Sequence, residues 1–215
     1  MIETVTIDGR ELKLGSVTLI VGLPGTRKTT LLEAIASQCQ TRALHLNRTP
    51  LTFDPDRPII ESLVHPDTGA ARLGENLALY ADDLFPHCHP HPPSSSAVQP
   101  ILVKLLSAQP GELVAIEKPE LMQHPRTVAT LTRVMVRAAV AGIQIVIETD
   151  SDVILDGFRI AVKAQEIPAA LFKIYNLSHG GDRTEIRCDE RGAIEDWPDG
   201  FFDQKDADWG KLFEI

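Results

Sequence analysis

The chain has 215 residues and a formal net charge of -9, from 21 lysine and arginine residues against 30 aspartate and glutamate residues. This length fits one α/β domain with a full core, and we expect residues 1–215 to form one domain. The acidic balance argues against broad contact with nucleic acid or anionic lipid. The scattered Cys39, Cys88 and Cys188 fit a reducing cytosol better than a disulfide framework. Apolar runs are no longer than a strand and the amino terminus has no signal-sequence pattern, so we expect a soluble cytoplasmic protein.

The amino-terminal part predicts a hairpin followed by a strand and a helix. Residues 1–7 alternate apolar and polar side chains, Asp8-Gly9-Arg10 is a turn, and residues 11–14 form a short return strand. The β-branched run Val17–Val21 then predicts a buried strand, and Lys28–Cys39 predicts an amphipathic helix.

The loop between this strand and this helix has the composition of a phosphate-binding P-loop. It is close to the Walker A pattern G-x-x-x-x-G-K-[ST]. Backbone N–H groups of such a loop surround phosphate oxygens, the lysine reaches the outer phosphates, and the threonine hydroxyl holds Mg²⁺. We therefore assign a nucleotide-phosphate site to Gly22, Gly25, Thr26, Arg27, Lys28, Thr29 and Thr30.

Arg27 stands where the pattern has glycine. Glycine lets the backbone come close to a phosphate, so the arginine side chain must instead point outward or reach round to the anion. The alternative is an ordinary turn that carries Lys-Thr. The strand and helix on either side favour the phosphate site.

Prolines interrupt residues 49–93, which therefore predict few long regular elements except around Leu73–Leu84. A short strand is expected before them, at Ala43–Leu46. Near their end, His87-Cys88-His89-Pro90-His91 brings together three imidazoles and a thiol, which can bind a transition metal. No second ligand pair stands at a matching spacing, so we favour a solvated loop over a metal site.

Two apolar strands in the second half of the chain end in carboxylates. Glu112–Ile116 leads into Glu117, and Ile143–Ile147 leads into Glu148-Thr149-Asp150-Ser151-Asp152. Because the strands are one βαβ step apart, these ends belong at the same edge of a parallel sheet. Helices are expected around them, at Val98–Ser107, Pro125–Ala141 and Val153–Lys163.

A carboxylate at that edge is what a Walker B position needs to hold Mg²⁺ through water, so Thr29 and Glu117 are the predicted metal ligands. A charged strand end that faces solvent is the alternative for Glu117. Thr149, Asp150 or Ser151 can approach a γ-phosphate from the second strand. Capping of the next helix by Ser151 or Asp152 is the other role for this cluster, and both roles can coexist.

Residues 171–177 and 184–188 predict a closing antiparallel pair of strands. Residues 189–215 form an acidic tail with five aromatic residues: Trp197, Phe201, Phe202, Trp209 and Phe213. Aromatic residues concentrated in this way pack back onto a domain or bind a partner.

The motifs resemble those of small prokaryotic AAA/ABC-type ATPases related to overcoming-lysogenisation-defect and SMC-like heads. Ile116–Pro125 matches their I-E-x-P-E-x-H-L-H-P, and Val146–Asp152 matches I-I-E-T-H-S-D. Asp196–Asp203 is similar to an uncharacterised carboxyl-terminal module of the same proteins, and the resemblance covers residues 1–40 and about 95–205. It implies an α/β P-loop NTPase fold with a mostly parallel sheet flanked by helices, an antiparallel N-terminal hairpin and C-terminal strands.

The chain departs from this family at several functional positions. Besides Arg27, Lys118 stands where many such ATPases have the carboxylate or amide that orients the attacking water. Asp150 replaces a histidine that would contact the γ-phosphate, and Ser94-Ser95-Ser96-Ala97 replaces a serine- and glycine-bearing signature. A glutamine loop is missing, and an inserted helical arm is missing or reduced. Losing one such group slows phosphoryl transfer by on the order of a hundredfold or more.

The resemblance implies binding of ATP with Mg²⁺ and slow or partner-dependent hydrolysis. Lys28 and Thr29 would bind phosphate and metal, Glu117 would hold the metal in catalysis, Glu120 is the candidate base, and Asp150 would lie near the γ-phosphate. A protein partner or a homodimer is expected, in a nucleotide-switched complex of a defence or DNA-maintenance system. No membrane contact is expected.

Two other functions stay open at this point. One is an inactive pseudo-ATPase scaffold, in which the fold is kept and the nucleotide is structural or absent. The other is a small-molecule P-loop kinase, which needs basic lid residues over the phosphates. Residues 49–93, which we regard as a variable proline-rich insertion, offer only Arg57 and Arg72 for that lid.

Overall fold

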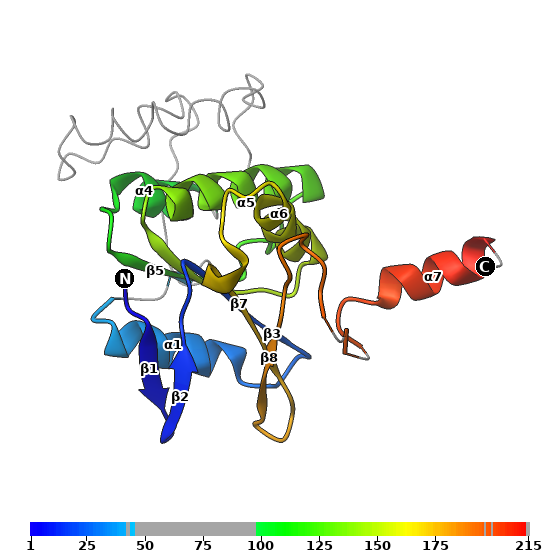
Figure 1. The fold of residues 1–215 in the computed structure, drawn as a ribbon, viewed down its shortest axis with the longest axis horizontal. Coiled ribbons are helices and arrows are strands. Elements are labelled where there is room, and N and C mark those ends of the chain that lie inside the picture. The colour runs from blue at the N-terminus through cyan, green and yellow to red at the C-terminus, as the bar shows by residue number, and fades with distance from the viewer. Residues whose placement is uncertain (42–43, 46–97, 196, 199, 214–215) are drawn as a thin grey trace.

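The computed structural model describes residues 1–41, 44–45, 98–195, 197–198 and 200–213. Within this part of the chain, a six-stranded sheet and a separate two-stranded hairpin are flanked by helices (Figure 1). The α/β fold with a mostly parallel sheet is the one predicted from the sequence.

The sheet strands, in spatial order, are β4 (Leu44–His45), β5 (Leu113–Glu117), β6 (Gln144–Glu148), β3 (Val17–Gly22), β7 (Phe172–Leu177) and β8 (Arg183–Ile186). Neighbours pair in parallel except β7 and β8, which are antiparallel. The central strand β3 pairs with β6 on one side and β7 on the other, so Val17 lies opposite both Ile145 and Phe172. Strands covered on both faces need continuous apolar runs, which is why β3 and β6 are rich in valine and isoleucine.

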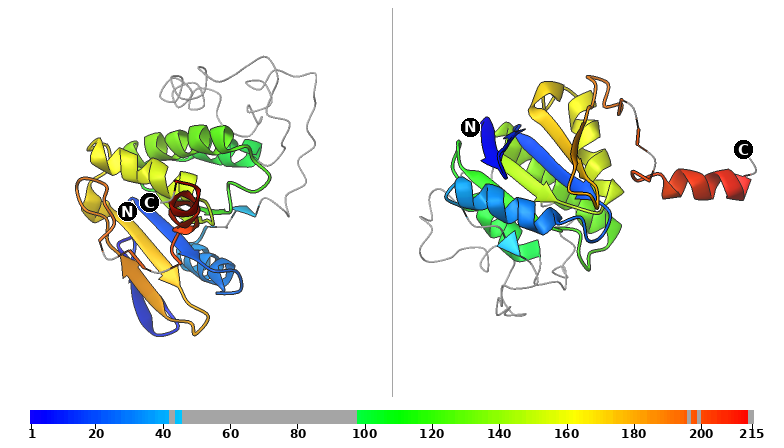
Figure 2. Two further views of the ribbon diagram at one scale, coloured as in Figure 1. Left: turned by 90° about the vertical axis from the view of Figure 1, so that its right-hand side faces the viewer. Right: turned by 90° about the horizontal axis from the view of Figure 1, so that it is seen from below.

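Helices cover both faces of the sheet (Figure 2). The helices α4 (Val98–Ser107), α5 (Pro125–Val140) and α6 (Asp152–Lys163) pack on one face. On the other face lie α1 (Lys28–Gln38) and the hairpin of β1 (Thr4–Ile7) and β2 (Arg10–Lys13). A short 3-10 turn, Ala169–Leu171, precedes β7, and the last helix, α7 (Gln204–Phe213), extends away from the other elements in Figure 1.

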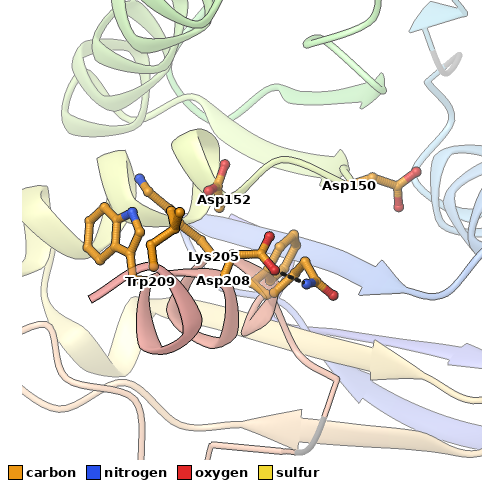
Figure 3. A pocket seen from close by; sticks show the side chains of 8 residues that line it. Asp150, Asp152, Lys205, Asp208 and Trp209 are labelled. Carbon is orange, nitrogen blue, oxygen red and sulfur yellow. Dashed lines mark hydrogen bonds between the residues drawn. The ribbon is translucent and has the colours of Figure 1, made fainter. Parts of the chain in front are cut away.

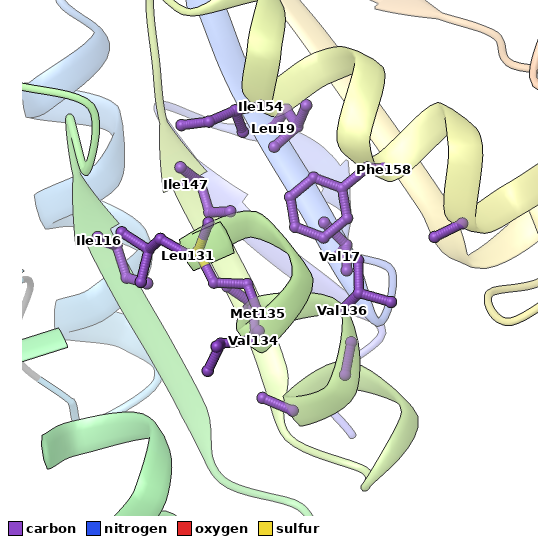
Figure 4. Packing of buried hydrophobic residues seen from close by; sticks show 14 of the residues in the cluster. Val17, Leu19, Ile116, Leu131, Val134, Met135, Val136, Ile147, Ile154 and Phe158 are labelled. Carbon is purple, nitrogen blue, oxygen red and sulfur yellow. The ribbon is translucent and has the colours of Figure 1, made fainter. Parts of the chain in front are cut away.

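The larger hydrophobic cluster lies between the sheet and helices α5 and α6 (Figure 4). Leu131, Met135 and Phe158 come from the helices and pack with Leu19 and Ile147 of the sheet, all buried. This cluster fixes the position of β3 and β6, whose carboxyl ends carry the candidate site.

The predicted elements are confirmed in order and type wherever the structure describes them. Boundaries differ by one to three residues: the first strand begins at Thr4, the return strand begins at Arg10, and the first helix ends at Gln38. The predictions for residues 49–93, including the His87–His91 cluster, and for Ser94–Ala97 lie outside the described residues.

The prediction of helix capping after β6 is partly wrong. Ser151 occupies the N-cap of α6, but its side chain makes no capping hydrogen bond, and Asp152 is already the first helical residue. Instead, the Ser151 N–H donates to the Thr149 hydroxyl at 3.0 Å. In the tail, Phe201 packs into the main core as expected, whereas Trp209 is half exposed on α7.

None of the helices in the described part of the chain combines the length and the apolar character needed to cross a bilayer.

Candidate functional site

The loop between β3 and α1 is shaped by its glycines and Thr26. Gly22 has φ 139°, and a Cβ on it would lie 2.5 Å from the carbonyl oxygen of Leu177, so only glycine fits there. Gly25 has φ 83° and faces open space. The buried Thr26 donates its hydroxyl to the carbonyl oxygen of Leu23 at 2.8 Å, which closes the turn ahead of the helix.

Arg27 is the N-cap of α1 and has the left-handed conformation, with φ 63° and ψ 32°. That conformation is costly for any residue with a Cβ, which gives a backbone reason for the glycine in the usual pattern. The Arg27 side chain is exposed, so it points outward, one of the two arrangements predicted. Thr30, in the first turn of α1, is exposed as well.

Lys28 is buried, with 4% of its surface exposed. Its ammonium group donates to the carbonyl oxygens of Gly22, at 2.5 Å, and Leu23, at 3.1 Å. It also lies 3.0 Å from Oδ1 of Asp150. An ammonium group has three N–H donors, so these three partners satisfy the buried charge.

Asp150, two residues after the end of β6, bridges two lysines. Besides the Lys28 contact, its Oδ2 accepts a hydrogen bond from Nζ of Lys118 at 2.6 Å. Its backbone N–H donates to Oε1 of Glu120 at 2.7 Å. Partial burial alone would raise the pKa of Asp150, but the hydrogen bonds and positive charges of Lys118 and Lys28 outweigh it and lower that pKa. Asp150 is therefore an anchored carboxylate anion at neutral pH.

The sequence alone shows Lys118 and Asp150 as two separate departures from a family pattern, and the structure pairs them. Lys118 has φ 43°, and its backbone N–H donates to the carbonyl oxygen of Glu148 at 2.8 Å. This turn directs the chain after β5 across the end of β6. The hydrogen bond to Asp150 is also the main cause of a raised pKa at Lys118, which keeps that ammonium charged.

Glu117 and Glu148 are partners in the register of β5 and β6, which confirms that the two strand ends share one sheet edge. Glu148 is 2% exposed, and the Thr29 hydroxyl is placed to donate a hydrogen bond to its carboxylate. Among the described residues, its Oε2 has no hydrogen-bond partner. Burial is the largest cause of a raised pKa at Glu148, with a further contribution from the charge of Glu117.

Glu148 was not expected to belong to the site, although it carries the same signal that identified Glu117. Both are carboxylates at the end of an apolar strand, one βαβ step apart. The sequence could not show which of them would be buried beside Thr29, because that depends on how the strands pack against α1.

Thr29, Glu117 and Glu148 form a set of hard oxygen donors that fits Mg²⁺. A buried carboxylate oxygen without a partner is costly, and a cation would satisfy it. No cluster of three or more histidine, cysteine, aspartate or glutamate side chains suited to a metal occurs in the described ranges. A cation at this edge would therefore complete its shell with the hydroxyl, water and phosphate oxygens.

Glu120 contacts the loop indirectly, through Asp150. Its Oε1 accepts the Asp150 N–H, while its Oε2 is buried and has no partner among the described residues. Burial raises the pKa of Glu120. A carboxyl group with a raised pKa and an unpaired oxygen is suited to exchange a proton with a neighbour.

A hollow of about 420 Å³ lies beside Asp150, between the start of α6 and the helix α7. In Figure 3 the Asp150 side chain extends away from Lys205, Asp208 and Trp209 of α7, and away from Asp152. The ammonium of Lys205 lies 5.0 Å from the centre of the Trp209 ring. Asp150 therefore lies at the edge of the hollow as one of its lining residues, while its carboxylate contacts Lys28 and Lys118.

Comparisons with known proteins show the fold. Residues 176–212 match a family model described as a protein of unknown function, DUF3696, in the region where the sequence resembles an uncharacterised C-terminal module. A search of curated proteins finds no match.

Two solved structures are similar over nearly the whole chain. One is a nucleotide-free ATP-binding cassette from an ABC transporter, at 14% identity and TM-score 0.51, covering 86% of both chains. The other is an ATP-binding cassette of an ABC transporter in its ADP conformation, at 14% identity and TM-score 0.54, covering 88% of this chain and 90% of that one. With a loop of P-loop shape between β3 and α1, this protein has the α/β fold of the ATP-binding cassettes.

Proposed function

We propose that this protein binds ATP with Mg²⁺ at the loop between β3 and α1, and hydrolyses it slowly or only with a partner. The observation that supports this proposal most strongly is the environment of Lys28 and its neighbour Thr29. A buried ammonium follows a glycine-shaped loop. The next residue, Thr29, lies beside the buried carboxylate of Glu148, one oxygen of which has no hydrogen-bond partner among the described residues. The cassette fold of the similar structures agrees with such a site.

Each group of the loop has a role in this proposal. The backbone of Gly22–Lys28 would surround the phosphates, and Lys28 would bind the outer ones. The exposed Arg27 guanidinium would contribute charge at the mouth of the loop. Thr29, Glu117 and Glu148 would hold Mg²⁺, which neutralises phosphate charge when bound.

Slow hydrolysis follows from the groups around the terminal phosphate. Lys118 carries an ammonium, which cannot accept a proton from an attacking water. Glu120, whose buried Oε2 has no hydrogen-bond partner in the described part of the chain, is our proposed base, and Glu117 would help to hold the metal. A partner that completes the site would raise the rate, because phosphoryl transfer depends on positioning and charge.

A scaffold that binds nucleotide without hydrolysis is the second candidate, and the Lys118–Asp150 ion pair at 2.6 Å favours it. In either case we propose that residues 1–215 act as one domain in a nucleotide-switched complex, with a protein partner or a second copy. A setting in defence or DNA maintenance rests on resemblance alone.

Calorimetric titration with ATP and Mg²⁺ tests the proposal. Wild-type protein is expected to bind at millimolar nucleotide or below. Lys28→Met keeps the apolar stem and removes the charge, which should weaken binding by about ten- to a hundredfold. Lys211→Met, at an exposed position of α7, is the matched control and should bind normally. Absence of binding heat for wild-type protein at millimolar nucleotide would contradict the proposal.

The same titration tests the metal site. Chelation by EDTA should weaken binding to wild-type protein, whereas Glu148→Gln should bind ATP equally with and without Mg²⁺. Glu190→Gln removes an exposed carboxylate in a turn and should keep the metal dependence. An unchanged metal dependence in Glu148→Gln would remove Glu148 from the site and leave the nucleotide site standing.

A further inference from the structure

The Asp150 carboxylate occupies the place where Lys28 would meet the outermost phosphate of a nucleotide. We propose that Asp150 is an internal anion that competes with the terminal phosphate of a nucleoside triphosphate, so that the site favours a diphosphate. This inference rests on the proposed nucleotide site and names the residue that decides between its two ligands.

The ammonium group of Lys28 has no free donor for a phosphate. All three N–H groups have partners: the carbonyl oxygens of Gly22 and Leu23, and Oδ1 of Asp150 at 3.0 Å. A phosphate oxygen that approaches Nζ must replace one of them. The carbonyls belong to the loop backbone, whereas the Asp150 side chain is 38% exposed and turns about its own bonds, so Asp150 is the partner that can leave.

Two further contacts hold Asp150 in place. Its Oδ2 accepts from Lys118 at 2.6 Å, and its backbone N–H donates to Glu120 at 2.7 Å. Two ammonium groups therefore converge on one carboxylate. A terminal phosphoryl group is also an anion with several acceptor oxygens, and it would need the same two lysines.

A nucleoside diphosphate and a triphosphate make different demands on this site. The inner phosphates of a nucleotide in a P-loop are bound mainly by backbone N–H groups, so a diphosphate can bind while Asp150 stays on its lysines. A terminal phosphate projects beyond the loop toward the ends of β5 and β6, where Asp150 lies. It must break the bridge and tolerate a like charge beside it.

Affinities for ADP and for adenylyl imidodiphosphate, a triphosphate analogue that is not hydrolysed, test the inference. Asp150→Asn keeps the shape of the side chain and removes its charge. We expect the Kd for the triphosphate analogue to fall by about tenfold or more and the Kd for ADP to change by less than about threefold. Asp152→Asn is the matched control, because that carboxylate faces the hollow beside α7, and it should leave both affinities unchanged.

A double variant distinguishes the loss of a competing anion from a general disruption of the site's structure. In Asp150→Asn/Lys118→Gln the second ammonium is gone, so most of the gain for the triphosphate should disappear. Should Asp150→Asn fail to fold, as judged by its thermal melt, Asp150→Ser carries the same expectation.

Two outcomes would contradict the inference, and they have different consequences for the proposed function. If both nucleotides bind and their affinity ratio is the same in wild-type protein and in the Asp150 variants, the inference is wrong and the nucleotide site stands. If neither nucleotide binds to wild-type protein or to any variant, the proposed function is overturned together with the inference.

Discussion

Arg27 adopts a backbone conformation that usually belongs to glycine, at a position where the P-loop pattern has glycine. Its φ of 63° is in the left-handed region, where a side chain costs about 1–2 kcal/mol relative to glycine. The arginine keeps that conformation because the buried Thr26 and Lys28 on either side fix the turn. The structure therefore pairs a strained backbone with an exposed guanidinium beside the helix N-terminus.

Arg27→Gly and Arg27→Ala separate these two effects. Both variants remove the guanidinium, but only glycine removes the steric strain of the left-handed backbone conformation. Because glycine also gains entropy in the unfolded chain, we expect Arg27→Gly to exceed Arg27→Ala in free energy of unfolding by only about 1 kcal/mol. Urea unfolding measures the difference. Equal stabilities of the two variants would show that residue 27 is not strained in the folded protein.

The scale of elements is illustrated by the contact of α5 with α6. Gly157 lies in the middle of α6, where glycine ordinarily weakens a helix. A Cβ at this position would lie 2.5 Å from Cγ2 of Thr132 on α5, so glycine is what lets the two helices approach. Phe158, next to it, is fully buried in the main core, and the packing of the two helices on the sheet depends on this approach.

Gly157→Ala is therefore expected to destabilise the protein, contrary to helix propensity. The propensity gain of about 1 kcal/mol is outweighed by an overpacking cost of about 1–3 kcal/mol. Gly157→Ala/Thr132→Ser removes the clashing methyl group, keeps the buried hydroxyl, and should recover much of the loss. Thermal or urea unfolding gives the three values. A more stable Gly157→Ala variant would mean that the helices are further apart than described.

At the scale of the whole molecule, polar side chains distant in sequence fasten the amino-terminal hairpin to the sheet. The Tyr175 hydroxyl of β7 donates to the carbonyl oxygen of Lys13 at 2.8 Å. The Gln144 side chain of β6 donates to the carbonyl oxygens of Ile2 and Gly15, at 2.7 Å and 2.8 Å. The hairpin is thus held by residues of two different sheet strands.

Tyr175 makes the stability of this arrangement depend on pH. Burial and then the charge of Glu185 raise the pKa of Tyr175 to about 12. In the unfolded chain a tyrosine has a pKa of about 10, so above that pH the unfolded state releases its proton first and is favoured. The contribution of Tyr175 is fully present below pH about 10 and is lost as the pH rises through about 12.

The Tyr175→Phe variant has no titrating group at this position, so it is the reference with which wild-type protein is compared at each pH. At neutral pH it should unfold with about 1 kcal/mol less free energy, because the Lys13 carbonyl loses its donor. The difference from wild-type protein should shrink as the pH rises from about 10 to about 12. Urea unfolding across this range measures it. A difference that stays constant with pH would contradict the raised pKa.

Local patterns were enough to predict most of the fold. The β-branched runs at Val17 and Ile143 give strands because such residues suit a sheet covered on both faces. Strand ends one βαβ step apart must share a sheet edge, which is why Glu117 and Glu148 were placed together. Capping at Ser151 was partly wrong: the sequence places Ser151 at the N-cap position, but the capping hydrogen bond also depends on the orientation of its side chain, and that bond is not made.

The order of the elements and the position of the loop can be read from the sequence, since both follow from hydrophobic period, glycines and a lysine-threonine pair. The ion pair of Lys118 with Asp150, which also takes the third donor of Lys28, depends on the folded structure. The burial of Glu148 beside Thr29 depends on the folded structure as well. The physical reason is that charge pairing and burial depend on distances between strands that are separated along the chain, and no local pattern records those distances.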